Sequence, residues 1–214
     1  MPGQVMSLAE VLRKIDERAE EALEPLRRRE VVPAPKGYKW YYCPKCLTSH
    51  TLSRYVVKKG RVACSRCNEP MRPLDEEFFK RSEELVETWR DKAKALIEKV
   101  WDVLEKWWPY KPMTADVGAD VTIYFDHPSY FKVEIERAKG EGAKLKAELY
   151  AHYFDERNVP MLQKVIEAVK EAKLEMHIAI DGRPDHCTVP KEKMEEMGFK
   201  RHSIWSLWVM DVSP

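Results

Sequence analysis

The sequence predicts a mixed α/β protein with an N-terminal helix, a small cysteine-bearing β module, a long helix and a C-terminal α/β domain with a mixed sheet. Two segments repeat apolar residues at helical spacing, and the last hundred residues alternate between strand-like and helix-like patterns. Two Cys-x2-Cys pairs bracket a short segment between the helices. We place the boundaries at residues 1–34, 35–74, 75–112 and 113–214.

The composition excludes several classes of protein. The 214 residues contain 37 Lys and Arg against 36 Asp and Glu, with 44% hydrophobic residues and seven Trp, which excludes a disordered chain. We expect no membrane segment and no export signal, and therefore a cytoplasmic protein. Only four amide side chains occur among many Lys and Glu, a bias typical of thermophiles; we expect a thermophilic, archaeal source, with chance bias as the alternative.

The first predicted helix covers residues 7–29. Ser7 and Glu10 form a capping-box pattern, and apolar residues follow at helical spacing from Leu8 to Leu23. Pro25 is expected to kink this helix or to end it early. Its apolar stripe is narrow, so we expect it to pack on another helix or on a partner chain.

The second predicted helix covers residues 75–108. Asp75 is the expected N-cap, an apolar stripe runs from Phe78 to Trp107, and Pro109 stops the helix. At 1.5 Å per residue it is roughly 50 Å long. A helix of this length suits dimerisation, a protein partner or a bridge between domains.

The C-terminal domain is expected to contain strands and helices in alternation. Leu145, Leu149 and Tyr153 step by four residues, so we predict a helix over 141–155. The other expected elements are strands at 121–125, 131–137, 174–180 and 203–212 and helices at 158–173 and 190–197.

The cysteine pairs predict a metal site. Cys43, Cys46, Cys64 and Cys67 give two Cys-x2-Cys turns separated by seventeen residues, which suits a closed tetrahedral thiolate site for structural Zn²⁺. A pair of redox disulfides is the less favoured alternative in a chain without an export signal. The segment looks like a zinc ribbon, with strands at 51–57 and 61–63 and a turn at 58–60. His50 is superfluous to a site that already has four thiolates.

The charge of the chain is unevenly distributed. Residues 35–73 contain nine basic residues and one acidic residue, whereas the whole chain has a net charge of +1. Basic residues interleaved with aromatic ones favour DNA or RNA, and docking on the acidic remainder or on a protein partner is the alternative. The expected contacts to nucleic acid are Lys45, Arg54, Lys58, Lys59, Arg61 and Arg66.

Acidic residues on two consecutive strands give a second candidate site. The hairpin that joins these strands can bring Asp120 beside Glu134, and clustered carboxylates can hold Mg²⁺ against a phosphate. This pattern resembles the PD-(D/E)xK nuclease superfamily and its degenerate relatives among the replication-relaxation proteins of mobile elements. The resemblance covers roughly residues 76–180 and implies Asp120 and Glu134 as metal ligands. Glu136 occupies the position where active nucleases have Lys, and Lys139 or Lys132 is the expected substitute.

The sequence leaves two functions open. The first is a zinc-ribbon protein that binds nucleic acid, with a nuclease-like domain that is active as a Mg²⁺-dependent nuclease or inactive. The second is a protein-interaction adaptor without nucleic-acid chemistry. The simpler alternative for the acidic residues is that they are only the solvent face of a strand. Cys187 is expected to be a small, partly buried loop residue, and the histidines show no metal-ligand spacing.

Overall fold

The structure, a computed structural model, describes residues 4–53, 56–57, 60, 62–126, 128–138, 142–202 and 205–214. The chain forms two compact units, each assembled from segments that are distant in sequence. Unit 1 comprises Met1–Asp16, Asp91–Glu134 and Leu145–Pro214, and unit 2 comprises Glu17–Arg90 and Ile135–Lys144. Helices and two separate sheets are both present, which confirms the predicted mixed α/β class.

The N-terminal helix α1 covers Leu8–Arg27. The backbone N–H of Ser7 donates to Glu10 Oε2 at 2.7 Å and the N–H of Glu10 donates to Ser7 Oγ at 3.4 Å, which confirms the capping box. Pro25 lies inside the helix rather than ending it. The buried stripe of α1 consists of Val11, Ile15, Ala19 and Leu23.

The long helix α3 covers Glu76–Trp107, 32 residues. Asp75 caps it, because Asp75 Oδ1 accepts a hydrogen bond from the N–H of Phe78 at 3.2 Å. At 1.5 Å per residue its length is about 48 Å. One face is buried along most of this length, at Trp89, Ala93, Leu96, Ile97, Val100, Leu104 and Trp107.

An eight-stranded sheet has the order β1-β5-β6-β7-β8-β9-β11-β10. Its strands are β1 Gln4–Val5, β5 Thr114–Val117, β6 Asp120–Asp126, β7 Ser129–Ala138, β8 Gly142–Ala151, β9 Glu175–Asp181, β10 Lys200–His202 and β11 Leu207–Val212. β8 and β9 are parallel, and helix α4, Val159–Glu171, is part of the connection between them. The carboxyl ends of β8 and β9 therefore lie at the same edge of the sheet.

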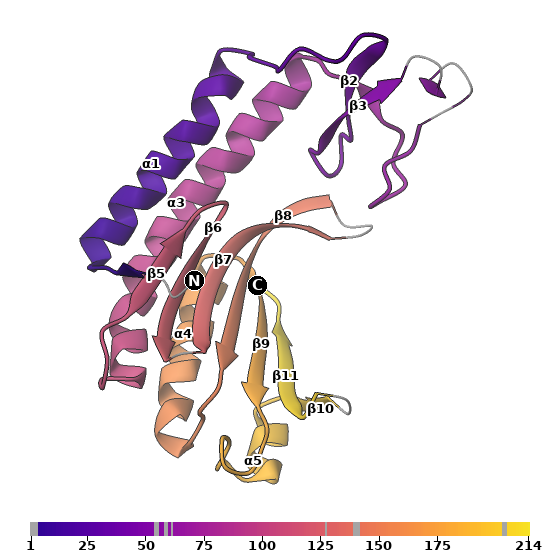
Figure 1. Cartoon of the computed structure of the whole chain (residues 1–214). Coiled ribbons are helices and arrows are strands. Elements are labelled where there is room, and N and C mark those ends of the chain that lie inside the picture. Colours follow the sequence, from indigo (N-terminus) through magenta and orange to yellow (C-terminus); the bar gives the residue numbers. More distant parts are fainter. Residues whose placement is uncertain are drawn as a thin grey trace. The chain divides into compact units, whose positions relative to one another are not determined.

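The core of unit 1 lies between one face of this sheet and two helices. Figure 1 shows α4 and the C-terminal part of α3 on the same face. The Trp107 ring lies 5.3 Å from the ring of Phe125 and 5.8 Å from that of Phe154, and Lys99 Nζ lies 2.5 Å from Glu171 Oε2. The buried residues on the sheet side include Val121, Ile123, Phe131, Val133, Ala147, Leu149, Met176, Ile178 and Ile180.

The small sheet of unit 2 has three strands in the order β3-β2-β4. They are β2 Tyr38–Tyr42, β3 Ser49–Ser53 and β4 Arg72–Pro73. The predicted strand 51–57 is wrong in its second half, because Val56 and Val57 are helical. The partner of β3 is β2, which precedes the first cysteine pair, rather than residues 61–63; Ala63 makes only an isolated bridge with Pro70.

The predicted helix over 141–155 is also wrong, because this segment contains strand β8. Ala147, Leu149 and Ala151 are buried, whereas Lys146, Glu148 and Tyr150 between them are partly exposed. Residues four apart share one face of a helix, and they also share one face of a strand, because alternate residues of a strand point to the same side. The steps of four between Leu145, Leu149 and Tyr153 therefore fit either element. Pairing with β9 overrides the helix propensity of this segment.

The predicted strand over 203–212 is shorter in the structure. β11 begins at Leu207 after a turn at Trp205 and Ser206, and it pairs with both β10 and β9. The edge strands β1 and β5 were not predicted from the sequence, since each is too short for a periodic pattern. In the described part of the chain, no helix combines the length and apolar character that crossing a membrane requires.

Candidate metal centres

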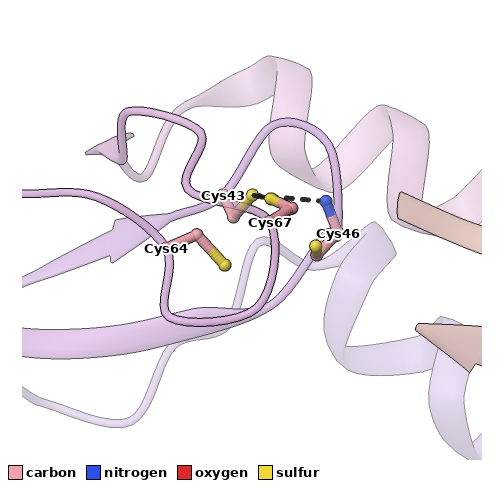
Figure 2. Close-up of side chains that lie close together, drawn as sticks. All are labelled: Cys43, Cys46, Cys64 and Cys67. Atoms are coloured by element: carbon pink, nitrogen blue, oxygen red, sulfur yellow. Dashed lines mark hydrogen bonds between the residues drawn. The ribbon is translucent and has the colours of Figure 1, made fainter. Parts of the chain in front are cut away.

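The cysteine cluster consists of Cys43, Cys46, Cys64 and Cys67. Their four sulfur atoms all lie within 4.8 Å of one another, and Cys43 Sγ and Cys67 Sγ are 3.4 Å apart. Figure 2 shows the four side chains gathered from two loops. A tetrahedral ion with metal–sulfur distances of 2.3 Å needs sulfur atoms about 3.8 Å apart. The cluster therefore fits a closed four-thiolate site, and its donor set suits Zn²⁺.

Two loops of the same design present these thiols. In the first loop, Cys43 exchanges backbone hydrogen bonds with Thr48 and Leu47, each 2.9 Å long, and Leu47 has a φ of 51°. In the second loop, Cys64 bonds in the same way to Glu69 at 2.8 Å and Asn68 at 2.9 Å, and Asn68 has a φ of 61°. The left-handed residue directly after each Cys-x2-Cys motif turns the chain back, so that both sulfur atoms of a pair point to one side.

The electrostatic environment of the thiols favours a bound cation. Burial raises the pKa of the Cys43 and Cys46 thiols. At Cys64 burial acts in the same direction, but the backbone N–H groups of Cys67 and Arg66 outweigh it and lower the pKa to about 7. Four clustered thiolates, three of them buried, are unfavourable without a metal ion, which would supply the missing positive charge.

A segment distant in sequence supports both loops. Arg137 Nε donates to the carbonyl of Cys46 at 3.3 Å, and Arg66 Nη1 donates to the carbonyl of Arg137 at 3.2 Å. The N–H of Ala143 donates to the carbonyl of Lys45 at 3.2 Å. Gly142 has a φ of 95°, and a Cβ atom there would lie 2.8 Å from the same carbonyl oxygen. Sequence patterns did not predict these contacts, because they join two segments of unit 2 that are distant in sequence.

The predicted nucleic-acid contacts are only partly described. Lys45 and Arg66 are exposed, as are Lys36, Lys39 and Arg72 in the same module. The predicted contacts Arg54, Lys58, Lys59 and Arg61 lie outside the described residues. Of the aromatic residues, Tyr38 is 44% exposed whereas Tyr42 is fully buried against the ring of Phe78, with ring centroids 5.2 Å apart. Tyr42 is therefore a core residue rather than a surface one.

The structure places Asp120 opposite Glu134 in neighbouring strands β6 and β7, as the sequence led us to expect. Lys132 Nζ lies 3.0 Å from both Glu134 Oε1 and Glu148 Oε2. Burial alone would lower the pKa of Lys132, but these two carboxylates raise it, so the ammonium stays charged.

The structure does not test the other two predicted residues of the acidic site. Glu136 belongs to unit 2, and Lys139 lies outside the described residues. Among the described residues, the metal-ligand groups of three or more members are the cysteine cluster and one further group, and neither includes Asp120 or Glu134.

That further group, the His/Asp cluster, consists of His152, Asp181 and His186. Asp181 Oδ2 lies 2.9 Å from His186 Nδ1 and 3.3 Å from His152 Nδ1. Asp181 is buried, and Arg183 and His186 hold its pKa well below the usual range although burial would raise it. The sequence analysis missed this group because its members are 29 and 5 residues apart and share no recognisable spacing. Neighbouring Cys187 is a buried loop residue, close to the expectation.

We compared the chain with protein-family models, with curated proteins and with solved structures, and none of these comparisons gave a match.

Proposed function

We propose that the protein binds DNA or RNA through a zinc ribbon formed by the cysteine module of unit 2. The observation that carries this proposal is the charge of residues 35–73, where nine basic residues accompany a single acidic residue. The chain outside this module has a net negative charge, so general basicity of the protein does not explain the positive module. A phosphate backbone is the partner that such a concentration of cations favours.

The described part of the module supports this proposal. All five of its described basic residues are exposed: Lys36, Lys39, Lys45, Arg66 and Arg72. Lys39 and Tyr41 lie on one face of β2, whereas the buried Tyr42 lies on the other face. Tyr41 pairs with His50 of the neighbouring strand β3. Cations beside partly exposed aromatic rings suit contacts to phosphates and unstacked bases together. The metal ion has a structural role here, because four thiolates leave no coordination position for water.

Charge reversal tests the proposal. We expect the Lys58→Glu, Lys59→Glu double variant to bind single-stranded and duplex oligonucleotides at least about tenfold more weakly in fluorescence anisotropy, with a shallower dependence on salt. The matched control is Lys191→Glu, Lys193→Glu on helix α5, Lys191–Glu196, which changes the net charge equally but lies in unit 1. Equal affinities for the two double variants, or affinity that does not change with salt, would contradict the proposal. Failure to bind either oligonucleotide would favour the adaptor.

We further propose that unit 1 contains a nuclease-like site at Asp120 and Glu134. The specific support is the position of Lys132, whose Nζ lies 3.0 Å from Glu134 on the same strand face. Two carboxylates from adjacent strands and a nearby Lys are the groups that a metal-dependent nuclease uses to hold Mg²⁺ and to stabilise developing charge. Lys132 supplies the cation that the sequence lacks at Glu136. The assignment of Glu136 and Lys139 to a catalytic role stays a prediction from the sequence.

Cleavage assays with Mg²⁺ or Mn²⁺ separate an active site from an inactive one. If the site is active, Asp120→Ala and Glu134→Ala each abolish cleavage while the far-UV circular dichroism spectrum stays unchanged. Asp116→Ala is the matched control, because Asp116 is an exposed carboxylate on the adjacent strand β5. Cleavage that persists in both site variants would remove these residues from the reaction. No cleavage by the wild type would leave a nucleic-acid-binding protein with an inactive domain.

A further inference from the structure

The His/Asp cluster lies where a β-α-β unit is expected to place a ligand site. His152 directly follows strand β8, Asp181 is the last residue of β9, and His186 is in the loop after β9. Because β8 and β9 are parallel, all three side chains come from the carboxyl ends of the strands. This edge is the usual position of binding sites in sheets of this kind.

We infer that His152, Asp181 and His186 form a second metal site, independent of the proposed nucleic-acid function. Metal–nitrogen and metal–oxygen distances of 2.0–2.2 Å at tetrahedral or octahedral angles require neighbouring donor atoms about 2.8–3.6 Å apart. Asp181 Oδ2 lies 2.9 Å from His186 Nδ1 and 3.3 Å from His152 Nδ1, within that range. The two imidazole rings have centroids 4.1 Å apart, so the two rings are in direct contact.

One nitrogen atom of the His/Asp cluster is buried without a hydrogen-bond partner. His152 Nδ1 is buried and makes no hydrogen bond, although Asp181 Oδ2 is only 3.3 Å away. A buried polar atom without a partner is unfavourable. An ion coordinated by both atoms would satisfy the nitrogen and the carboxylate oxygen together.

Outer contacts hold two of the three ligands in orientation. The backbone N–H and Nε of Arg183 donate to Asp181 Oδ1 at 3.1 and 3.0 Å. Arg183 also donates to Oδ2, from Nη2 at 2.5 Å and from Nε at 3.1 Å, and on metal binding these two bonds would yield to the ion while the pair at Oδ1 remains. On the far side of His186, Asp185 Oδ2 lies 3.5 Å from Nε2, which leaves Nδ1 directed at Asp181. Carboxylates behind a ligating imidazole are a common feature of metal sites.

The backbone joins the segments that carry the two histidines. The N–H of Phe154 donates to the carbonyl of His186 at 2.8 Å, and the N–H of Thr188 donates to the carbonyl of Phe154 at 3.1 Å. The N–H of His152 donates to Ser129 Oγ at 2.8 Å, and Ser129 is buried. The ligands are therefore positioned before an ion arrives, which lowers the cost of binding.

The donor set indicates the class of ion. Two imidazoles and one carboxylate suit a divalent first-row transition metal such as Zn²⁺ or Fe²⁺ rather than Mg²⁺ or Ca²⁺. Three protein ligands leave at least one position for water or a ligand, in contrast to the closed cysteine cluster. Asp181 also lines a surface cavity of about 480 Å³ together with Tyr150, Arg183 and Trp205.

Metal counting on the full chain tests this inference. After equilibration with excess Zn²⁺ and desalting, elemental analysis is expected to give two zinc ions per chain for the wild type and one for His152→Ala and for His186→Ala. The matched control is His177→Ala, because His177 also pairs with a carboxylate, Asp211, at 2.8 Å but belongs to no group of three potential ligands among the described residues. This variant is expected to retain two ions. If an alanine variant does not fold, the corresponding glutamine variant replaces it.

A second readout separates the two sites. Co²⁺ at the cysteine cluster produces intense thiolate-to-metal absorption, whereas Co²⁺ at the His/Asp cluster produces only weak visible bands. The weak bands should disappear in His152→Ala and His186→Ala while the thiolate absorption remains. One zinc ion per chain in the wild type would overturn the inference. Retention of the second ion by both site variants, or its loss in His177→Ala, would do so as well.

Discussion

The ribbon of unit 2 and the sheet of unit 1 are stabilised by different means. In the ribbon, the buried cluster consists of Cys43, Cys46 and Cys64, with Cys67 and Met71 packed against it. In unit 1, large apolar side chains from the sheet and two helices form the core, among them Phe125, Phe131, Leu149 and Leu104, all 2% exposed or less. The difference teaches that apolar side chains fill the core of unit 1, whereas thiols that could hold a metal ion lie at the centre of the cysteine module.

Loss of the metal should produce the largest effect, and it should be confined to unit 2. Structural zinc sites contribute apparent binding free energies of about 10–16 kcal/mol. We expect Cys64→Ser to remove the thiolate-to-cobalt absorption and the hydrogen-exchange protection of residues 36–74, with the amides of β6 to β9 still protected. Cys187→Ser is the control, because Cys187 is buried outside the cluster. If hydrogen-exchange protection of residues 36–74 were as strong in Cys64→Ser as in the wild type, the metal would not be what stabilises the cysteine module.

A change in the apolar core should destabilise unit 1 and leave the metal content of the cysteine cluster unchanged. Leu149 on β8 is fully buried, and Leu→Ala changes at such positions cost about 2–5 kcal/mol. We expect Leu149→Ala to lower the free energy of unfolding of unit 1 by this amount in urea denaturation, while the metal content of the cysteine cluster stays unchanged. Val32→Ala, at a side chain that is 76% exposed, should change stability by less than about 0.5 kcal/mol. Equal effects of the two variants would show that β8 is not a core strand.

The contact between the first residue of β8 and the loop that carries Cys43 and Cys46 gives a smaller prediction. An alanine at Gly142 would have a φ of 95° and a Cβ atom 2.8 Å from the carbonyl oxygen of Lys45. Gly142→Ala should therefore cost about 1–3 kcal/mol and speed the release of metal to a chelator. Gly118→Ala is the control, since its Cβ would meet no atom within 4 Å. Identical rates of metal release for the two variants would show that this contact does not stabilise the cysteine loops.

The polar face of unit 1 gives the smallest prediction, a dependence on pH. Burial would raise the pKa of Glu148, but hydrogen bonds from Tyr130 and Lys132 hold it below its ordinary value of 4.5. A lowered carboxyl pKa contributes stability that is present above pH 4.5 and is lost as the pH falls through the folded-state pKa. As the pH is lowered from 4.5, we expect the free energy of unfolding of the wild type to decrease by about 1 kcal/mol more than that of Glu148→Gln. Glu167→Gln, at an exposed residue of α4, should follow the wild type.

Local patterns in the sequence predicted the parts of this fold that depend on neighbouring residues. The caps at Ser7 and Asp75, the strands around Val121 and Phe131 and the four cysteines all follow from spacing within a few residues or from one repeated motif. Strand β8 was missed because its apolar spacing fits a helix as well, and only the parallel partner β9 decides between them. The His/Asp cluster was missed for the same reason. Its ligands meet only after the β-α-β connection has formed.

The dependence of nucleic-acid binding on the metal tests the central claim most directly. Oligonucleotide affinity is measured by anisotropy on the same preparation before chelation, after chelation and after Zn²⁺ is restored. If the metal-organised ribbon carries the contact, binding is lost with the metal and returns with it, while the circular dichroism of unit 1 changes little. Undiminished binding by the metal-free protein would contradict the account, because the cations would then bind phosphate without the fold that the cysteine cluster maintains.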